Sequence, residues 1–358
     1  MPELENARRD RLRAVLGERD LDAALVTDLV NVRYLTGFTG SNGALLVTVG
    51  GAAFATDGRY TDQAAAQCPD LETTTTRQLT AALLAGAGGI GRLGVETHVL
   101  TVDAHAALTE QAGDETALVP LGRAVETLRQ VKDAAEIDAL SRACAISVTA
   151  LADLLAGPLL GRTERAVARD LEWRMYALGA EAIAFDTICA SGPHSAVPHH
   201  EPTERVLTRG DLLKIDFGAR VDGYHADCTR TSVLGEPADW QVEIHRAVRD
   251  AQQAGVDAMV AGAAAATPDA VARAVLDKAG WLEQFTTGIG HGVGLAIHED
   301  PFVGPRNPGV LLAGTPVTME PGVYLPGRGG VRIEDTVVVR DGPPDVLTDA
   351  PRDLLVVG

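Results

Sequence analysis

Two aspartates stand on either side of a predicted tight turn in the second half of the chain. Asp216 and Asp227 flank Asp222-Gly223, a dipeptide typical of β-hairpin turns. A loop centred near Val221-Asp222 would place the two aspartates directly opposite one another, and a loop centred on Asp222-Gly223 would place them diagonally. In either register their β-carbons are expected within roughly 5–8 Å of one another.

Two glutamates repeat this arrangement later in the chain. Glu320 and Glu334 are symmetric about Gly327 and should face one another across a second hairpin. Both hairpins are largely apolar near these residues, and like charges that face each other there are costly unless a cation lies between them. A single pair could be solvent-facing, but two pairs in one domain favour a shared divalent cation bound by carboxylate oxygens.

A histidine surrounded by glycines offers a fifth ligand. Glycines recur at alternate positions around His291 in the segment 288–294, so that backbone can pass close to a site. Its imidazole suits manganese, cobalt, iron or zinc. A Rossmann phosphate loop is the rival interpretation, but a third glycine at the proper offset and a preceding strand are missing. His298-Glu299 resembles the start of the zincin motif HExxH, which Phe302 breaks.

Two further histidines have a weaker claim to chemistry. His298 follows His291 by seven residues, and His199 precedes Asp216 by seventeen. Taken singly, each is more typical of a surface or core histidine than of a catalytic one.

Strand and helix signals show which elements position these residues. The predicted strands of the two hairpins cover 212–218 with 224–234, and 317–325 with 330–339. Predicted helices cover 134–155, 163–178 and 240–260, and a fourth runs to about 280 with Thr267 as N-cap and Pro268 as first helical residue. Helices beside antiparallel hairpins indicate an α+β arrangement.

The first third of the chain alternates helical and strand signals. An amphipathic helix is predicted over 8–21, and short buried strands over 23–27 and 44–49 are separated by the glycine-rich turn 37–40. This alternation indicates an α/β domain with a largely covered sheet. The boundary is placed ahead of the long helix, which gives domains 1–127 and 128–358.

Composition narrows the class of protein and its partners. Of the 358 residues, 46% are apolar and 22% charged, which excludes a disordered chain. The net charge of −18 repels phosphate backbones, so nucleic acid is not expected as a partner. Four scattered cysteines suit a reducing compartment and argue against a thiolate zinc site. No stretch resembles a signal peptide or membrane span, so a cytoplasmic location without membrane contact is expected.

These motifs resemble the pita-bread metallopeptidases, in particular the proline-specific branch of Xaa-Pro aminopeptidase (aminopeptidase P) and Xaa-Pro dipeptidase (prolidase). Besides the aspartate pair eleven residues apart, the resemblance is carried by Asp227-Cys228-Thr229-Arg230-Thr231, Gly290-His291-Gly292-Val293-Gly294, Met319-Glu320-Pro321-Gly322 and Arg332-Ile333-Glu334-Asp335. The segments 191–196, 198–200, 34–41 and 56–60 extend it over nearly the whole chain. It implies a C-terminal pita-bread (creatinase/aminopeptidase) α+β fold preceded by a smaller creatinase-type α/β domain.

The resemblance also assigns roles to single residues. Asp227 and Glu334 would bridge two divalent metal ions, with Asp216 completing one site and His291 and Glu320 the other. Manganese is the first expectation, with cobalt, zinc or iron as alternatives.

The same resemblance implies a proline-specific metalloaminopeptidase that cuts between an N-terminal residue and a penultimate proline. A hydroxide bridging the two ions would attack, and Glu320 would shuttle its proton to the leaving nitrogen. His199 and His298 would act on the substrate side and in catalysis, and Tyr324 and Arg332 would lie beside the substrate and orient the carboxylates.

Several alternatives remain open beside this assignment. A dipeptidase restricted to Xaa-Pro dipeptides is the main one, and the expected partners are small proline-containing peptides and, at the family level, a second copy in a homodimer. A non-catalytic binding module and an amidinohydrolase such as creatinase are disfavoured because all five ligand positions are intact. Methionine aminopeptidase is disfavoured because it usually lacks the N-terminal domain.

Overall fold

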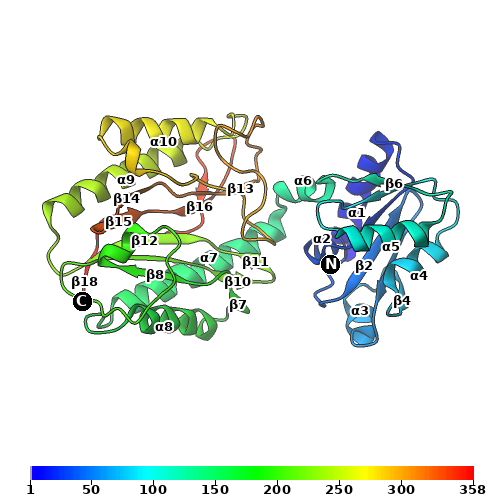
Figure 1. Cartoon of the computed structure of the whole chain (residues 1–358), viewed down its shortest axis with the longest axis horizontal. Coiled ribbons are helices and arrows are strands. Elements are labelled where there is room, and N and C mark those ends of the chain that lie inside the picture. The colour runs from blue at the N-terminus through cyan, green and yellow to red at the C-terminus, as the bar shows by residue number, and fades with distance from the viewer. Residues whose placement is uncertain (1) are drawn as a thin grey trace. The chain divides into compact units, whose positions relative to one another are not determined.

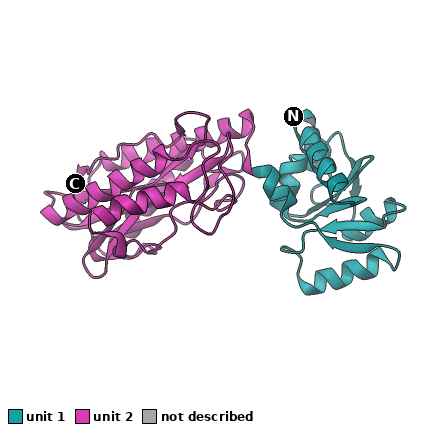
Figure 2. Ribbon diagram, turned by 90° about the horizontal axis from the view of Figure 1, so that it is seen from above, with its two compact units in different colours: residues 1–129 teal, residues 130–358 magenta. Residues whose placement is uncertain are grey.

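The computed structural model describes residues 2–358 and divides the chain into two compact units (Figure 2). The first ends at Arg129 and the second runs from Gln130 to Gly358, so the change of unit falls within the short helix α6 (Ala124–Gln130). Among the helices described, none has the length and apolar character needed to cross a membrane.

A six-stranded mixed sheet organises the N-terminal unit, in the order β4-β3-β2-β1-β5-β6. Its strands are β1 (Ala23–Val26), β2 (Gly43–Thr48), β3 (Ala52–Thr56), β4 (Glu72–Thr75), β5 (Arg92–Val95) and β6 (Ala117–Pro120). The four residues of β1 are all buried, and β1 pairs antiparallel with β2 and parallel with β5. The α/β character predicted for this region is confirmed.

Helices connect and cover the strands of this sheet. They are α1 (Pro2–Glu18), α2 (Leu29–Thr36), α3 (Thr61–Gln67), α4 (Leu79–Gly86) and α5 (Val102–Ala112). The predicted first helix is confirmed, but the prediction that only a glycine-rich turn separates β1 from β2 was incomplete. Asp28 caps α2 by accepting from the Val30 amide, and Gly37 ends it in the left-handed conformation at φ 76°.

The second unit contains four long helices in two pairs. They are α7 (Ala134–Leu155), α8 (Glu164–Ala177), α9 (Asp239–Asp257) and α10 (Thr267–Lys278). The start of α7 agrees with the prediction because Asp133 and Glu136 form a capping box. The predicted cap of α10 was wrong by one residue: Ala266 is the N-cap, and Thr267 is already helical without a capping side-chain hydrogen bond.

Short strands fill the space between the helix pairs. They are β7 (Ala182–Ile183), β8 (Ile188–Ser191), β9 (Leu212–Phe217), β10 (Ala219–Val221), β11 (Tyr224–His225), β12 (Cys228–Leu234), β13 (Pro316–Met319), β14 (Gly322–Leu325), β15 (Gly329–Arg332), β16 (Asp335–Val338), β17 (Asp345–Val346) and β18 (Val356–Val357). The long strands predicted over the hairpins are therefore interrupted, and the interruptions fall at or beside Asp227, Glu320 and Glu334.

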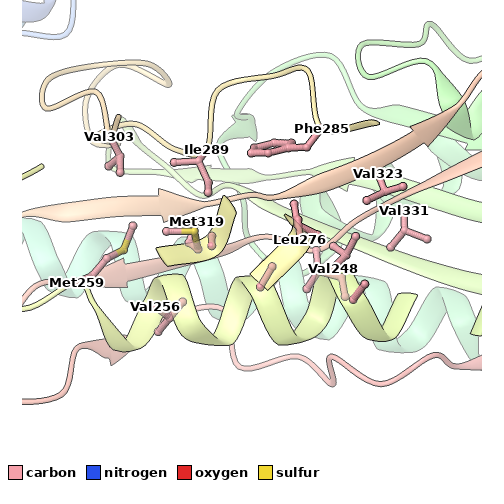
Figure 3. Close-up of a cluster of buried hydrophobic side chains, with 14 of the residues drawn as sticks. Val248, Val256, Met259, Leu276, Phe285, Ile289, Val303, Met319, Val323 and Val331 are labelled. Atoms are coloured by element: carbon pink, nitrogen blue, oxygen red, sulfur yellow. The ribbon is translucent and has the colours of Figure 1, made fainter. Parts of the chain in front are cut away.

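Two apolar cores hold this unit together, one under each helix pair. Figure 1 shows α7 and α8 on one side of the strands and α9 with α10 on the other. The core under α9 and α10 includes Leu276, Phe285, Ile289 and Met319, whose side chains converge between the helices and the second hairpin (Figure 3). The predicted α+β arrangement is confirmed. The strands lie between the two helix pairs, and the candidate site is built on these strands and the loops beside them.

Candidate metal centre and pocket

The register of the first hairpin decides how its two aspartates lie. Asp216 pairs with Thr229, and Arg220 with His225, so the turn is centred on Asp222-Gly223. Both turn residues have positive φ, 50° for Asp222 and 84° for Gly223, as a primed hairpin turn requires. Asp227 is therefore the diagonal neighbour of Asp216, which is the second of the two registers considered from the sequence.

The second hairpin places its glutamates opposite one another. Met319 pairs with Asp335 on one side of the interruption, and Gly322 pairs with Arg332 on the other. Both ladders have the same register, so Glu320 and Glu334 occupy facing positions between them. Glu334 also bridges to Thr229 of β12, which joins the two hairpins at the level of the carboxylates.

One pocket of about 350 Å³ collects the predicted residues. Its lining includes all five candidate ligands and both substrate-side histidines: Asp216, Asp227, His291, Glu320, Glu334, His199 and His298. Phe185, Ile188 and Ile297 supply apolar lining. The predicted residues Tyr324 and Arg332 do not line this pocket; both are buried behind Asp216.

The candidate ligands are close enough to share cations. Ligand atoms of Asp227, His291 and Glu334 all lie within 4.8 Å of one another. His291 Nε2 is 3.5 Å from Asp227 Oδ2 and 3.6 Å from Glu320 Oε1. Asp227, His291 and Glu334 are buried, whereas the Glu320 side chain is 20% exposed. Glu320 is therefore the carboxylate of this group that reaches furthest toward the pocket.

Burial makes this cluster electrostatically unfavourable without a cation. Burial and the neighbouring carboxylates raise the pKa of Asp227 and of Glu334 well above the ordinary range. Burial likewise raises the pKa of Glu320 to about 7 and lowers the pKa of His291 to about 4, which leaves the imidazole neutral and able to bind a metal.

Glycines let the backbone carry His291 into the cluster. A β-carbon on Gly290 would lie 2.0 Å from the Thr318 carbonyl oxygen, and one on Gly292 would lie 2.4 Å from that of Asp300. His291 itself is bound through backbone to the same strand, since the Thr318 amide donates to its carbonyl oxygen. The alternating glycines therefore serve close backbone approach.

Arg332 connects the carboxylates from behind. Its guanidinium donates to Asp216 Oδ2, to the Tyr324 hydroxyl at 2.9 Å and to the Thr229 hydroxyl at 3.0 Å. Thr229 in turn donates to Glu334 Oε2 at 2.7 Å. Asp216 Oδ1, by contrast, is buried and has no hydrogen-bond partner among the described residues. A buried carboxylate oxygen that has no hydrogen-bond donor is expected to bind a cation.

The motif residues Arg230 and Asp335 tie the two hairpins together further from the pocket. Arg230 Nη1 donates to the Glu334 carbonyl oxygen at 2.6 Å, and Nη2 forms an ion pair with Asp335 at 2.7 Å. Asp335 is fully buried and also receives hydrogen bonds from Gln252 and Arg352. These contacts fix the backbone on which Glu334 stands.

The two further histidines, His199 and His298, line the pocket from two loops. The rings of His291 and His298 meet edge to face with centroids 4.4 Å apart. Glu299, the next residue, forms a buried ion pair with Lys132 at 2.5 Å, which anchors that loop. His199 also lines the pocket, from the segment that follows the helix η1 (Gly192–Ala196).

Sequence reasoning missed two buried charged residues beside His199. Glu164 is fully buried and accepts hydrogen bonds from Ser191, His194, His200 and Thr203. Burial raises its pKa, but hydrogen bonds, chiefly from His200, outweigh this effect and lower the pKa to about 2. Glu164, His194 and His200 have the spacing of a metal site, yet both Glu164 oxygens are already occupied by protein donors.

The second missed residue is Lys214 in β9. It is buried completely, and burial together with Arg332 lowers the pKa of its ammonium to about 6. A lysine inside the apolar run Leu212-Leu213-Lys214-Ile215 was the available signal.

Fold and site together define a metallopeptidase, and the chain belongs to metallopeptidase family M24, whose model matches residues 138–341. The model of the creatinase/prolidase N-terminal domain matches residues 8–131. These matches confirm the pita-bread fold and the family resemblance drawn from the motifs.

Individual relatives span nearly the whole chain. The uncharacterized peptidase YqhT of Bacillus subtilis is 38% identical over 97% of this chain and 99% of its own length. The structure of an Xaa-Pro dipeptidase from Bacillus anthracis matches with a TM-score of 0.95 and 37% identity, covering 99% of this chain and all of that one. An X-Pro aminopeptidase from Thermotoga maritima matches with a TM-score of 0.89 and 34% identity, over 94% and 98% of the two chains.

Proposed function

We propose that the protein is an exopeptidase that hydrolyses the peptide bond between an N-terminal residue and a penultimate proline. The observation that carries this proposal is the convergence of Asp216, Asp227, His291, Glu320 and Glu334 with His199 and His298 around one pocket. Relatives with similar chains over their full length are named Xaa-Pro dipeptidase and X-Pro aminopeptidase, which supports the choice of substrate.

The donor set fits two divalent cations. Four carboxylates and a neutral imidazole offer hard oxygen ligands and one nitrogen, and the Asp216 oxygen without a partner points to a missing cation. Asp227 and Glu334 would be shared by both ions, Asp216 would complete one site, and His291 with Glu320 the other. When bound, such ions act as Lewis acids and lower the pKa of water toward neutrality.

The side chains around the pocket would handle the proton and the substrate carbonyl. Glu320 is more exposed than Asp227, His291 and Glu334, which are buried. It would accept a proton from the attacking water and deliver it to the prolyl nitrogen. His199 and His298 would donate hydrogen bonds to the developing oxyanion. Arg332 would hold Asp216 in place through the ion pair behind the pocket.

A prolyl bond needs this kind of dedicated enzyme. The bond before proline is a tertiary amide without an N–H, so proteases that rely on this donor cut it poorly. The proposal includes manganese as the first metal to test, a homodimer as the assembly and the cytoplasm as the location. The four cysteines are free and buried, in keeping with a reducing compartment.

Restriction to dipeptides is the second candidate function. The Bacillus anthracis relative is named Xaa-Pro dipeptidase, and so is one from Pyrococcus furiosus that is 41% identical over 64% of this chain. These names favour a preference for Xaa-Pro over longer peptides. Only the length of peptide accepted beyond proline separates the two candidates.

The decisive assay offers Xaa-Pro and Xaa-Pro-Yaa peptides to chelated protein and then to manganese-reloaded protein. Activity restored on the tripeptide would establish the aminopeptidase, and activity restored on the dipeptide alone would establish the dipeptidase. An Xaa-Ala-Yaa peptide of the same length is the control for proline specificity. No activity on either proline peptide, with metal demonstrably bound, would contradict the proposed substrate.

A further inference from the structure

The segment that presents His199 is held by the buried amino group of Lys214. Lys214 Nζ donates to the carbonyl oxygen of Val197 at 2.6 Å and to that of Pro198 at 3.1 Å. These are the two residues directly before His199. Lys214 is completely buried, whereas Val197 is 46% exposed. The lysine thus reaches from the interior of the sheet to a segment that is partly at the surface.

Strand geometry places this lysine beside the candidate metal ligands. Lys214 and Asp216 are two residues apart in β9, so their side chains leave the same face of the sheet. Arg332 Nη1 also donates to the Pro198 carbonyl oxygen, at 3.1 Å, while Nη2 contacts Asp216. Lys214 and Arg332 therefore hold the segment before His199 together, and Arg332 also holds the Asp216 carboxylate.

The buried amine of Lys214 forms no ion pair within the described residues 2–358. Its further contact is with the Tyr324 ring, whose centroid lies 5.2 Å from Nζ. A lysine amine removed from water is costly unless it is hydrogen-bonded. An aliphatic residue like the neighbouring Leu213 and Ile215 would pack at this strand position without that cost. The contacts that distinguish a lysine here are those to Val197 and Pro198.

We propose that Lys214 is a positioning residue of the peptidase, which holds the imidazole of His199 at the pocket by fixing the two preceding carbonyl groups. The role rests on the proposed function, in which His199 contacts the substrate carbonyl. On the far side of His199, the segment is held independently, because His200 Nε2 bonds to the buried Glu164 at 2.9 Å. Removal of the lysine therefore leaves the Val197 carbonyl without its donor and the Pro198 carbonyl with Arg332 alone, while the His200 side of the segment stays attached.

A double-mutant cycle with His199 tests this role. Lys214→Met retains the approximate length of the side chain without its hydrogen-bond donor and should lower kcat on the preferred proline peptide by about 30- to 100-fold, as displacement of a catalytic group by about 1 Å does. In a His199→Ala background the same change should cost less than about threefold, since there is no imidazole left to misplace. Metal content should stay at the wild-type level.

Lys278→Met is the matched control, because Lys278 is an exposed lysine at the end of α10. It should leave kcat unchanged in both backgrounds. A loss for Lys214→Met that is equally large with and without His199 would overturn the proposal, and so would wild-type kcat in Lys214→Met. If Lys214→Met does not fold, Lys214→Gln takes its place in the same cycle with the same criterion.

Hydrogen exchange of the manganese-loaded protein gives a readout that does not depend on substrate. Amides in 192–201 should exchange at least about tenfold faster in Lys214→Met, while those in 228–234 keep their protection. Unchanged exchange in 192–201 would overturn the proposal. A wild-type enzyme inactive on proline peptides would contradict the proposed function instead, and the exchange experiment would still test the contact between Lys214 and the segment.

Discussion

The two carboxylate oxygens of Asp216 differ in their surroundings. One of its oxygens is held by Arg332, and the other is buried without a partner among the described residues. A buried carboxylate oxygen left alone is destabilising, so the arrangement is favourable only when a cation completes it. The sequence indicated that these carboxylates lie together, because like charges that face each other on apolar hairpins are costly without a cation, and the structure brings them to one pocket.

Glu320→Gln tests the proton-transfer role of the most accessible carboxylate. The amide has nearly the same shape but can neither accept the proton nor bind a cation as strongly. We expect kcat on the preferred proline peptide to fall at least about 10³-fold, with metal content lowered or weakened. Glu243→Gln, an exposed change on α9, is the control. Near-normal activity in Glu320→Gln would contradict the role.

His298→Ala separates substrate contact from metal binding. His298 lines the pocket and touches the ring of His291. We expect kcat/KM to fall about 10²-fold while metal content, measured by atomic absorption, changes little. Equal loss of metal and activity would instead make His298 a ligand.

His245 is expected to make the protein less stable in mild acid. It is 3% exposed in α9, and burial, followed by Arg249, lowers its pKa from 6.5 to about 4. The unfolded chain therefore binds a proton that the folded chain excludes between these two pH values, so stability falls as the pH drops from about 6.5 to 4. This group accounts for roughly 2–3 kcal/mol of that loss.

Urea unfolding of chelated protein at pH 7.5 and pH 4.5 measures this effect. His245→Gln carries no proton in either state and should lose less stability than the wild type between the two pH values. His105→Gln, an exposed histidine on α5, is the control. Equal acid-induced losses in the wild type and His245→Gln would contradict the assignment.

At the scale of elements, the sequence predicts best those features that are determined by residues close together in the chain. The capping box fixes the start of α7, and Asp222-Gly223 fixes the turn of the first hairpin. The helix α2 was missed because the glycine-rich segment after it was taken as the whole connection. The roles of Lys214 and Arg332 could not be read locally, since their partners Val197 and Pro198 lie in another segment.

The core beneath α9 and α10 should dominate the stability of the second hairpin. Leu276 is fully buried in that cluster (Figure 3). Val271 on the same helix is 36% exposed. Leu276→Ala should lower the free energy of unfolding by about 2–5 kcal/mol, because it leaves a cavity. Val271→Ala should change it by less than about 1 kcal/mol. Similar effects of the two changes in denaturant titrations would contradict this packing.

At the scale of the whole molecule, all the candidate ligands belong to the second compact unit. Manganese should therefore raise hydrogen-exchange protection in the strands around 212–234 and 316–338 after chelated protein is reloaded. The strands of the N-terminal sheet, from β1 to β6, should show no change and serve as the internal control. Protection that is unaffected by manganese in both hairpins would contradict a metal centre there.

The joining of the two hairpins through Thr229 and Glu334 has a consequence for biosynthesis. Asp216 and Glu334 are 118 residues apart in the chain, so a ribosome that has released the first hairpin has delivered only part of the ligand set. The proposed metal centre cannot be completed, and the proposed hydrolysis cannot begin, until the segment through Glu334 has also emerged.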